Sequence, residues 1–245
     1  MLLPARDAAS SPLITRLGRL APLDRDEVDA LVLAERTARR SPARREIVAE
    51  GAPIRDQRAI LSGWAFRQRI LADGSRQILQ FLLPGDLIGM CRQESPLAVT
   101  SIGAVTEVVL CQLPAPMGGG GLLRASAMSA AFEEFILLAQ ITRLGRLDAL
   151  SRVADWLLET HDRLRLAGLC EGDTFAMPLT QEMLADCLGL TSVHVNRTLQ
   201  TMRRDGLLEG RSGTVTLPDR KRLEKLVDYR PVEVSAASGG TTRTR

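Results

Sequence analysis

The sequence predicts an α+β protein with an N-terminal antiparallel β-roll, one long helix and a C-terminal winged helix-turn-helix. Between about residues 41 and 115, short runs of Ile, Leu and Val alternate with turn sequences such as "LSGW", "ADGS" and "LPGD". This pattern is typical of many short antiparallel strands. Residues 122–147 carry an extended helical pattern, and residues 179–204 hold two shorter helical patterns separated by Gly189. Of the 245 residues 45% are hydrophobic and 25% charged, which is enough apolar material for a buried core.

The roll is predicted over residues 13–121, with two helical segments at its start. Residues 13–34 have helical spacing interrupted by Pro22, and Asp24 is placed to cap the second segment, whose first turn is acidic. Further along, "WAFRQRILADGSRQILQFLLPGD" predicts a β-hairpin, because its Asp-Gly pair tolerates the positive φ of a tight turn. The run "MGGGG" at 117–121 predicts a hinge or loose turn, since glycine disfavours regular structure.

The long helix predicted over residues 122–147 has two apolar stripes. One follows the spacing of a two-stranded coiled-coil seam, which predicts that this helix pairs with a second copy of the chain. The other, formed by Leu137, Ile141 and Leu144, is expected to face the roll of the same subunit. A single broad face turned towards one core is the alternative interpretation. The residues predicted at the dimer interface are Met128, Phe132, Phe135, Ala139 and Thr142.

The C-terminal region, residues 148–230, contains the strongest functional pattern. After a helix predicted over 148–166 comes "LTQEMLADCLGLTSVHVNRTLQTMRR", which is typical of a helix-turn-helix. Gly189 permits the sharp turn between its helices, and the Thr191 hydroxyl can cap the second one. The side chains expected to pack the two helices together are Leu184, Ala185 and Leu188 on the first and Val195, Leu199 and Met202 on the second.

The outer face of the second helix carries short or planar hydrogen-bonding groups instead of the Glu and Lys of an ordinary solvated face. A helix-turn-helix places this helix in the major groove of DNA, with its first residues against base edges. Arg197 is a candidate for a bidentate contact with guanine, and Val193 for a contact with a thymine methyl group. The residues predicted to contact bases are Ser192, Val193, Asn196, Arg197 and Gln200.

A wing is predicted after the second helix, where "DGLLEGRSGTVTLPD" gives two short strands around a Gly-Arg-Ser-Gly turn. Residues 197–225 hold eight Arg or Lys against four Asp or Glu. Such a region can be merely a solvated surface, but beside a helix-turn-helix it favours phosphate contacts. The residues predicted to contact phosphates are Thr180, Thr191, His194, Arg204, and Arg211 and Ser212 at the wing tip.

Cysteine spacing predicts no metal site, and no cofactor is expected. No apolar stretch approaches the length needed to cross a bilayer, so no membrane partner is expected. Cys91, Cys111, Cys170 and Cys187 are far apart in the sequence, which favours reduced thiols in a cytoplasmic protein. A redox pair between Cys91 and Cys111 is the alternative. The start of the chain has no basic segment followed by an apolar run, so a signal peptide is not expected. Residues 231–245 are small, polar and basic, which predicts disorder.

These patterns resemble the Crp/Fnr family of bacterial transcription regulators over roughly residues 13–229. The resemblance rests on "LSGW…DGSRQILQFLLPGDLIG" in the roll and "LTQEMLADCLGLTSVHVNRTLQTMRRDGLL" in the C-terminal region. It implies that the roll is a cyclic-nucleotide-binding-like sensor domain, that the long helix pairs two subunits, and that the dimer binds a palindromic promoter site. It also implies base contacts from Ser192, Val193, Arg197 and Gln200, and DNA-backbone contacts near Thr180, Thr191, His194 and Arg211.

The stretch "GMCRQESPLAVTSIG", residues 89–103, departs from the cyclic-AMP-responsive members of that family. Those members hold the ribose and cyclic phosphate with a Gly-Glu pair and an Arg-Ser pair. Here the Glu falls at about Met90 or Cys91 and the Arg-Ser pair at about Pro96-Leu97. A buried phosphate needs a guanidinium and hydrogen-bond donors, so cyclic-nucleotide binding is not expected. No cysteine precedes Cys91 to hold an iron–sulfur cluster, and both histidines lie outside the roll, where a haem would need one.

The sequence therefore predicts a homodimeric, sequence-specific DNA-binding transcription regulator with double-stranded DNA and RNA polymerase as partners. Its signal is expected to be an unidentified small-molecule effector, not cyclic AMP, sensed by the roll. Val193 replaces the usual Glu of the best-known members, which predicts a different DNA consensus. The alternative is a constitutive DNA binder whose roll serves only dimerisation and polymerase contact. An enzyme or a free-standing ligand-binding subunit has less support, because the sequence offers no nucleophile with a paired base.

Overall fold

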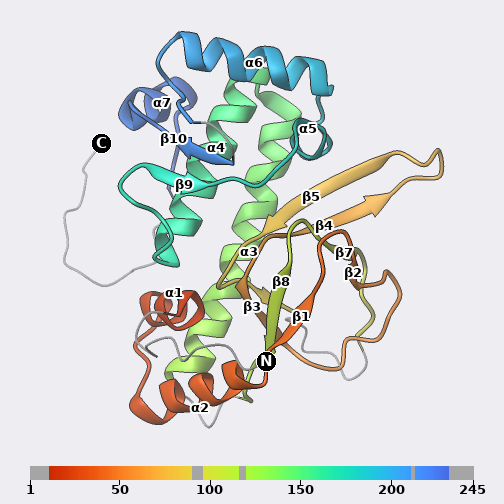
Figure 1. Cartoon of the computed structure of the whole chain (residues 1–245), viewed down its shortest axis with the longest axis vertical. Coiled ribbons are helices and arrows are strands. Elements are labelled where there is room, and N and C mark those ends of the chain that lie inside the picture. The colour runs from red at the N-terminus through yellow and green to blue at the C-terminus, as the bar shows by residue number, and fades with distance from the viewer. Residues whose placement is uncertain (1–10, 90–95, 116–119, 211–212, 232–245) are drawn as a thin grey trace, which may run out of the picture.

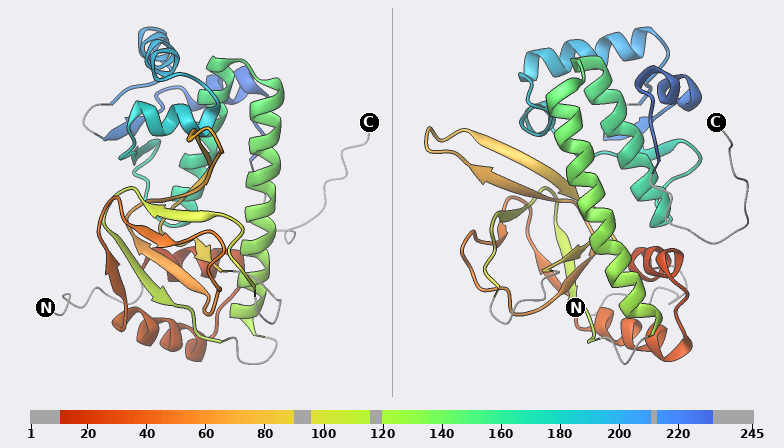
Figure 2. Two further views of the ribbon diagram at one scale, coloured as in Figure 1. Left: turned by 90° about the vertical axis from the view of Figure 1, so that its right-hand side faces the viewer. Right: turned by 180° about the vertical axis from the view of Figure 1, so that it is seen from behind.

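The computed structural model describes residues 11–89, 96–115, 120–210 and 213–231 (Figure 1). A roll of short strands forms one end of the molecule and a group of helices forms the other. A single long helix, α3 (Gly121–Arg146), runs beside both (Figure 2). Two short helices, α1 (Pro12–Leu20) and α2 (Arg25–Arg36), lie at the roll end of α3 (Figure 1). The predicted order of roll, long helix and C-terminal helices is therefore confirmed.

The roll consists of two four-stranded antiparallel sheets, as the spacing of the turn sequences predicts. One sheet has the order β1-β8-β3-β6 and the other β2-β7-β4-β5, so strands that are distant in the sequence lie side by side. Their apolar side chains form a core that includes Ile60, Leu82, Ile102 and Val108. The strands are β1 (Arg39–Ser41), β2 (Glu46–Val48), β3 (Arg58–Ser62), β4 (Ala65–Ile70), β5 (Arg76–Leu82), β6 (Leu87–Ile88), β7 (Ser101–Ala104) and β8 (Val108–Gln112).

The predicted hairpin is formed by β4 and β5. In its turn Gly74 has a φ of 82°, and the Asp73 carboxylate accepts a hydrogen bond from the Ser75 backbone N–H at 2.9 Å. These are the roles that the Asp-Gly sequence predicts. The hairpin extends out of the roll towards helix α5 (Gln181–Leu188) of the C-terminal region (Figure 1).

The start of α3 is fixed by close packing against the segment that leads into α2. Asp24 caps α2, as predicted, through reciprocal hydrogen bonds with Glu27 at 2.9 and 3.0 Å. Gly121 is the first residue of α3, and a Cβ there would lie 1.9 Å from the Pro22 carbonyl oxygen. The prediction of a loose turn is wrong for Gly121, because this residue lies in α3. A glycine is needed at this position because the Pro22 backbone leaves no room for a Cβ. Residues 116–119 lie outside the described ranges.

Helix α3 turns a different face towards its own subunit than the sequence predicts. Phe132 is buried, and the Arg16 guanidinium of α1 lies 5.8 Å from its ring centroid. Its placement on an intersubunit seam is wrong, because α1 covers that side of the helix. Leu137 and Ile141 were expected to face the roll but are exposed, Ile141 to 68%, and Leu144 is half-buried. The residues that α3 buries include Leu122, Ala125, Ser129, Phe132, Ile136, Gln140 and Arg143.

The C-terminal region folds into a helix-turn-helix with a small sheet, as predicted. The sheet pairs β9 with β10 in antiparallel register. Its helices and strands are α4 (Ala149–Leu166), β9 (Thr174–Ala176), α5 (Gln181–Leu188), α6 (Ser192–Arg204), β10 (Thr214–Thr216) and α7 (Arg220–Val227). Within the described ranges, no helix has both the length and the apolar character needed to cross a membrane.

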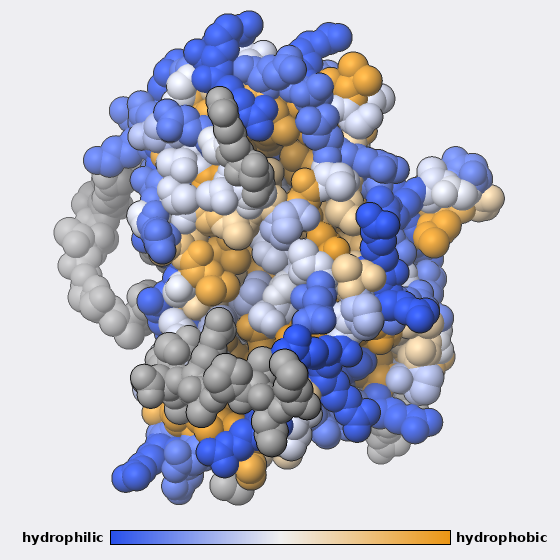
Figure 3. All heavy atoms as spheres, in the orientation of Figure 1, coloured by the Kyte–Doolittle hydropathy of each residue, from blue (hydrophilic) through white to orange (hydrophobic). Residues whose placement is uncertain are grey.

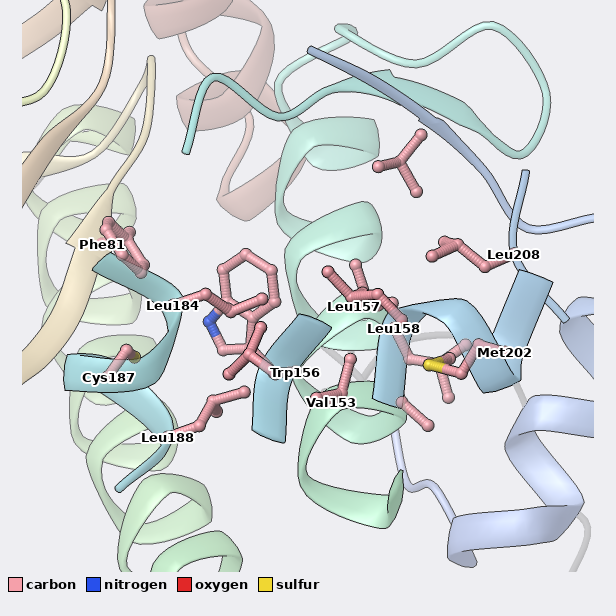
Figure 4. Packing of buried hydrophobic residues seen from close by; sticks show 14 of the residues in the cluster. Phe81, Val153, Trp156, Leu157, Leu158, Leu184, Cys187, Leu188, Met202 and Leu208 are labelled. Atoms are coloured by element: carbon pink, nitrogen blue, oxygen red, sulfur yellow. The ribbon is translucent and has the colours of Figure 1, made fainter. Parts of the chain in front are cut away.

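The roll and the C-terminal helices share one hydrophobic core (Figure 4). Phe81 of β5 lies between Trp64 of the roll and Trp156 of α4, with ring centroids 6.2 and 5.7 Å away. Figure 4 shows Phe81 on the side of Leu184 and Cys187 of α5. Buried aromatic rings contribute strongly to core stability. The position of the helix-turn-helix is therefore tied to the roll by packing as well as by the chain.

A series of buried ion pairs crosses the same junction. Arg163 of α4 donates to the Asp86 carboxylate at 2.7 Å and to Glu159 at 3.3 Å. Glu159 also accepts from Arg143 of α3 at 2.8 Å, and Asp86 faces Arg16 of α1 at 3.5 Å. Opposite charges alternate along this series. Because removing one partner would leave a buried charge uncompensated, the ion pairs hold α1, the roll, α3 and α4 in one arrangement.

The substitution Phe81→Ala should lower the free energy of unfolding by about 3–5 kcal/mol, because it removes a ring from the shared core. Chemical denaturation followed by tryptophan fluorescence measures this, since Phe81 neighbours both tryptophans. Leu33→Ala is the control, because Leu33 is 63% exposed and its loss should change stability by no more than about 0.5 kcal/mol. Equal stability of the Phe81→Ala and wild-type proteins would contradict the shared core.

Candidate nucleic-acid interface

The first helix of the pair, α5, ends at Gly189, where the sequence predicts the turn, and begins after Thr180. The Thr180 hydroxyl accepts a hydrogen bond from the Met183 backbone N–H at 3.1 Å and caps the helix. Leu184 and Leu188 are buried beneath α6. The helix ends at Gly189, which has the left-handed conformation, with a φ of 62°. This conformation lets the chain turn sharply into the second helix.

The second helix, α6, is fixed in its rotation about its own axis. The Thr191 hydroxyl caps its start by accepting from the His194 N–H at 3.2 Å. Val195, Leu199 and Met202 are buried, at the spacing i, i+4 and i+7 that places them on one side of a helix. With that side packed into the core, the opposite side must face solvent. We call α6 the recognition helix from here on.

The solvent side of the recognition helix carries the residues predicted to contact bases. Ser192, Val193, Arg197 and Gln200 are exposed, Val193 to 67%. Asn196 is half-buried, and its Oδ1 accepts a hydrogen bond from Gln181 Nε2 at 3.4 Å. The helix lies at the end of the molecule farthest from the roll, where Figure 3 shows a mainly hydrophilic surface. Four of the five predicted base-contacting residues therefore share one exposed face, and Asn196 lies at its edge.

Four of the residues predicted to contact phosphates fall within the described ranges. Thr180, Thr191, His194 and Arg204 are exposed. Both threonine hydroxyls accept a cap hydrogen bond, which leaves their O–H free to donate to a phosphate oxygen. Arg204 Nε lies 3.3 Å from the carboxylate of Asp205. All four side chains are therefore accessible to a phosphate.

The wing is present but is paired differently from the prediction. Its second strand is β10, which pairs mainly with β9, a strand that the sequence did not indicate. The predicted first strand is reduced to one residue pair, in which Glu209 and Thr216 exchange two backbone hydrogen bonds of 2.9 Å. The predicted tip residues Arg211 and Ser212 lie outside the described residues.

Three side chains that the sequence did not indicate hold the turn between the two helices. Gln77 of the roll hairpin donates to the Asp186 carbonyl oxygen at 2.7 Å, and Gln140 of α3 donates to the Cys187 carbonyl oxygen at 2.6 Å. Arg152 of α4 donates to the carbonyl oxygens of Leu188 and Gly189 at 3.0 and 3.4 Å. No sequence spacing reveals these contacts, because the donors and acceptors are 36 to 109 residues apart.

The thiols of Cys111 and Cys187 are not accessible at the exposed face of α6. Cys111 and Cys187 are buried, and burial raises the pKa of Cys111 to about 11 and that of Cys187 to about 12. Both thiols are therefore protonated near neutral pH and are poor nucleophiles. Cys91, the proposed redox partner of Cys111, lies outside the described residues. The residues that the structure describes contain no group of three or more His, Cys, Asp or Glu able to hold a metal ion.

Residues 151–226 match the family model described as a Crp-like helix-turn-helix domain. The chain is 36% identical over 174 residues to the "Nitrogen fixation regulation protein FixK" of Bradyrhizobium diazoefficiens, covering 68% of this chain and 72% of that protein. It is 31% identical over 215 residues to the "Transcriptional activatory protein AadR" of Rhodopseudomonas palustris, covering 85% and 87% of the two chains. The solved structure of FixK2 from Bradyrhizobium japonicum superimposes with a TM-score of 0.65 at 27% identity, covering 83% of this chain and 98% of that one.

Fold and exposed helix together define a winged helix-turn-helix DNA-binding protein. The chain belongs to the Crp/Fnr family of transcriptional regulators. The family resemblance predicted from the sequence and the predicted fold class are thereby confirmed, and so is the general function of a Crp/Fnr-type DNA-binding transcription regulator.

Thiol labelling tests the state of Cys111. At pH 8 the native protein should leave Cys111 unmodified by iodoacetamide, because its pKa of about 11 keeps the thiolate scarce and burial blocks access. Cys170, which is only half-buried, is the internal control and should react first. Peptide mass spectrometry after timed quenching measures both. Rapid modification of Cys111 in the folded protein would contradict the buried position.

Proposed function

We propose that the chain acts as a homodimer whose two recognition helices bind the two halves of a palindromic promoter site. The observation that carries this proposal is the exposed polar face of the recognition helix, which no other part of the described chain covers. The two halves of such a site lie about one DNA turn, roughly 34 Å, apart. The dimer would have to hold its two recognition helices at that separation.

Base recognition is assigned to the exposed side chains of α6. The planar guanidinium of Arg197 suits a bidentate contact with O6 and N7 of guanine, and the apolar Val193 suits a thymine methyl group. Ser192 and Gln200 supply further hydrogen-bonding groups, and Asn196 contributes from the edge of the face. A Val at position 193 accepts no hydrogen bond, so we expect no selection for cytosine at the base that it meets.

Phosphate contacts are assigned to groups at the helix starts and around the exposed face. Thr180 and Thr191 stand at the N-termini of α5 and α6, where free backbone N–H groups and the helix dipole favour an anion. His194 and Arg204 lie beside the same face. We propose the same role for Arg211 and Ser212, on the basis of the sequence alone. Such contacts fix the position of the protein on DNA without reading its sequence.

The exposed side of α3 is assigned to the dimer interface. Met128 and Phe135 are each 37% exposed, and Thr142 is exposed, in keeping with the seam proposed from the sequence. Ala139 is half-buried, and Phe132 is excluded by its burial. Leu138 and Ile141, exposed to 56% and 68%, complete the stripe instead. A stripe of this kind is costly in water and is stabilised by pairing with a second copy.

The roll is assigned the sensing role, with an effector other than cyclic AMP, and RNA polymerase is the expected partner at the promoter. Pro96 and Leu97 carry neither a guanidinium nor a hydroxyl for a cyclic phosphate. The same absence favours the alternative of a constitutive DNA binder. A thermal-shift screen separates the two, because a true effector binds the native state and raises the melting temperature further as its concentration exceeds its Kd. Cyclic nucleotides and small metabolites are the compounds to include.

Arg197→Ala should weaken binding to the preferred DNA site by about 1–3 kcal/mol and relax base preference at one position in each half-site. The loss follows from removing a bidentate contact with a base edge. Fluorescence anisotropy with duplexes substituted at each half-site position measures both effects.

Arg203→Ala is the matched control for this change. Arg203 has the same charge on the same helix but lies on a different side of it. Its loss should lower affinity for all sequences alike, if at all. An Arg197→Ala protein with wild-type affinity and wild-type base preference would show that the assignment of Arg197 is wrong.

Ile141→Glu should convert the dimer to a monomer and abolish binding to the palindromic site, because it places a charge in the apolar stripe of α3. Analytical ultracentrifugation measures the first effect and anisotropy the second. Leu33→Glu, at a side chain of α2 that is 63% exposed and not part of the α3 stripe, should change neither. A dimer that survives Ile141→Glu would exclude this stripe as the interface.

A further inference from the structure

The carbonyl oxygens at the turn of the helix-turn-helix are bonded from three separate parts of the molecule. The last carbonyls of an α-helix have no partner within the helix. In α5 they accept instead from Gln77 of the roll, Gln140 of α3 and Arg152 of α4. Four successive carbonyls, those of residues 186–189, are engaged in this way. The turn that sets the direction of the recognition helix is therefore held from outside the helix-turn-helix.

The roll contributes two neighbouring residues of β5, Arg76 and Gln77, which both bond to the end of α5. Arg76, next to Gln77 on β5, donates from Nε and Nη2 to the same carboxylate oxygen of Asp186, at 2.8 and 2.5 Å. The Arg76 guanidinium also lies 5.5 Å from the centroid of the Phe66 ring, which restricts its orientation. Both partners of the ion pair are roughly one-quarter exposed. We call the bonds from Arg76 and Gln77 to Asp186 and Cys187 the hairpin contact.

The hairpin contact lies away from the face that meets DNA. Its acceptors belong to the end of α5, whereas Ser192, Arg197 and Gln200 of α6 remain exposed. The docked arrangement therefore leaves the recognition face open. A contact that hid this face would oppose DNA binding. The hairpin contact instead holds α5 against the roll, which favours DNA binding because it reduces the motion of the recognition helix.

We propose that Arg76 and Gln77 are positioning residues for the recognition helix. By holding the end of α5 against the roll hairpin, they set where α6 stands relative to the rest of its subunit. In a homodimer they would thereby set the distance between the two recognition helices and so the preferred spacing of the half-sites. The statement about spacing rests on the proposed function, whereas the positioning of α5 and α6 within one subunit does not.

The first test compares an Arg76→Ala/Gln77→Ala protein with wild type on the tightest palindromic duplex that wild type selects. Two further duplexes have their half-sites moved by one base pair in either direction. The variant should bind the preferred duplex about ten-fold more weakly and should discriminate less between the spacings. Base preference within a half-site and the dimer state should not change, because α6 and α3 are intact.

Arg69→Ala is the matched control. Arg69 lies on the same hairpin, opposite Gln77 in the strand register, and is exposed. Within the described ranges its guanidinium pairs with no carboxylate, so its loss should leave affinity and spacing discrimination unchanged. Wild-type affinity and spacing discrimination in the Arg76→Ala/Gln77→Ala protein would overturn the proposal. Tighter binding by that variant would also overturn it, since the contact would then be inhibitory.

The second test needs no DNA and separates this proposal from the proposed function. In hydrogen-exchange mass spectrometry the Arg76→Ala/Gln77→Ala protein should exchange faster over residues 181–204 than wild type, while the roll core stays protected. A protein with the ion pair reversed, Arg76→Asp/Asp186→Arg, should again show slow hydrogen exchange. If a variant exchanged fast only because it failed to fold, reversing the ion pair would not slow its exchange. Unchanged exchange in the Ala variant would overturn the positioning role. Faster exchange in a protein that binds no palindromic DNA would leave the positioning role standing and overturn the proposed function.

Discussion

The burial of Val195, Leu199 and Met202 is the constraint on which the functional interface depends. These side chains lie on one side of α6 and are packed against α4 and α5. Rotating the helix about its axis would bring apolar groups into water, at about 25 cal/mol for each Å² exposed. The side that carries Ser192, Arg197 and Gln200 is therefore fixed towards solvent. Without this packing the same sequence would present no defined face to DNA.

The parts of the structure that the sequence predicted well are those governed by local interactions. The cap at Asp24, the Asp-Gly hairpin, the left-handed Gly189 and the cap at Thr191 each involve residues a few positions apart. The spacing of apolar residues likewise identified the buried side of α6. Each of these features follows from backbone geometry and side-chain chemistry within one or two turns of the chain.

Features that depend on contacts between distant segments were not predictable from the sequence. Helical spacing shows which residues of α3 share a side, but not which side meets α1. Phe132 was therefore placed on the wrong side of the helix, and Leu137 and Ile141 were wrongly directed to the roll. The pairing of β9 with β10 likewise joins segments some forty residues apart, and nothing in the wing sequence indicates it. Gln77 and Gln140 bond to carbonyl oxygens of α5 that are 109 and 47 residues away, so no local spacing identifies these contacts.

Two physical routes connect the roll to the recognition helix. One passes through α3, where Glu133 accepts from Arg67 and Gln80 of the roll at 2.6 and 3.0 Å, and Gln140 bonds to the end of α5. The other is the hairpin contact, supported by Phe81 in the shared core. Coupling between two binding sites is reciprocal. Any effector that strengthens DNA binding through these routes must itself bind more tightly when DNA is present.

We propose above all that two copies of α6 bind DNA as a twofold-related pair. Selection of bound duplexes from a randomised pool by the purified full-length chain tests it most directly. A pair of recognition helices should enrich palindromic sequences whose half-sites are centred about one helical turn apart. Enrichment of a single unrepeated half-site, or no enrichment over the starting pool, would contradict it.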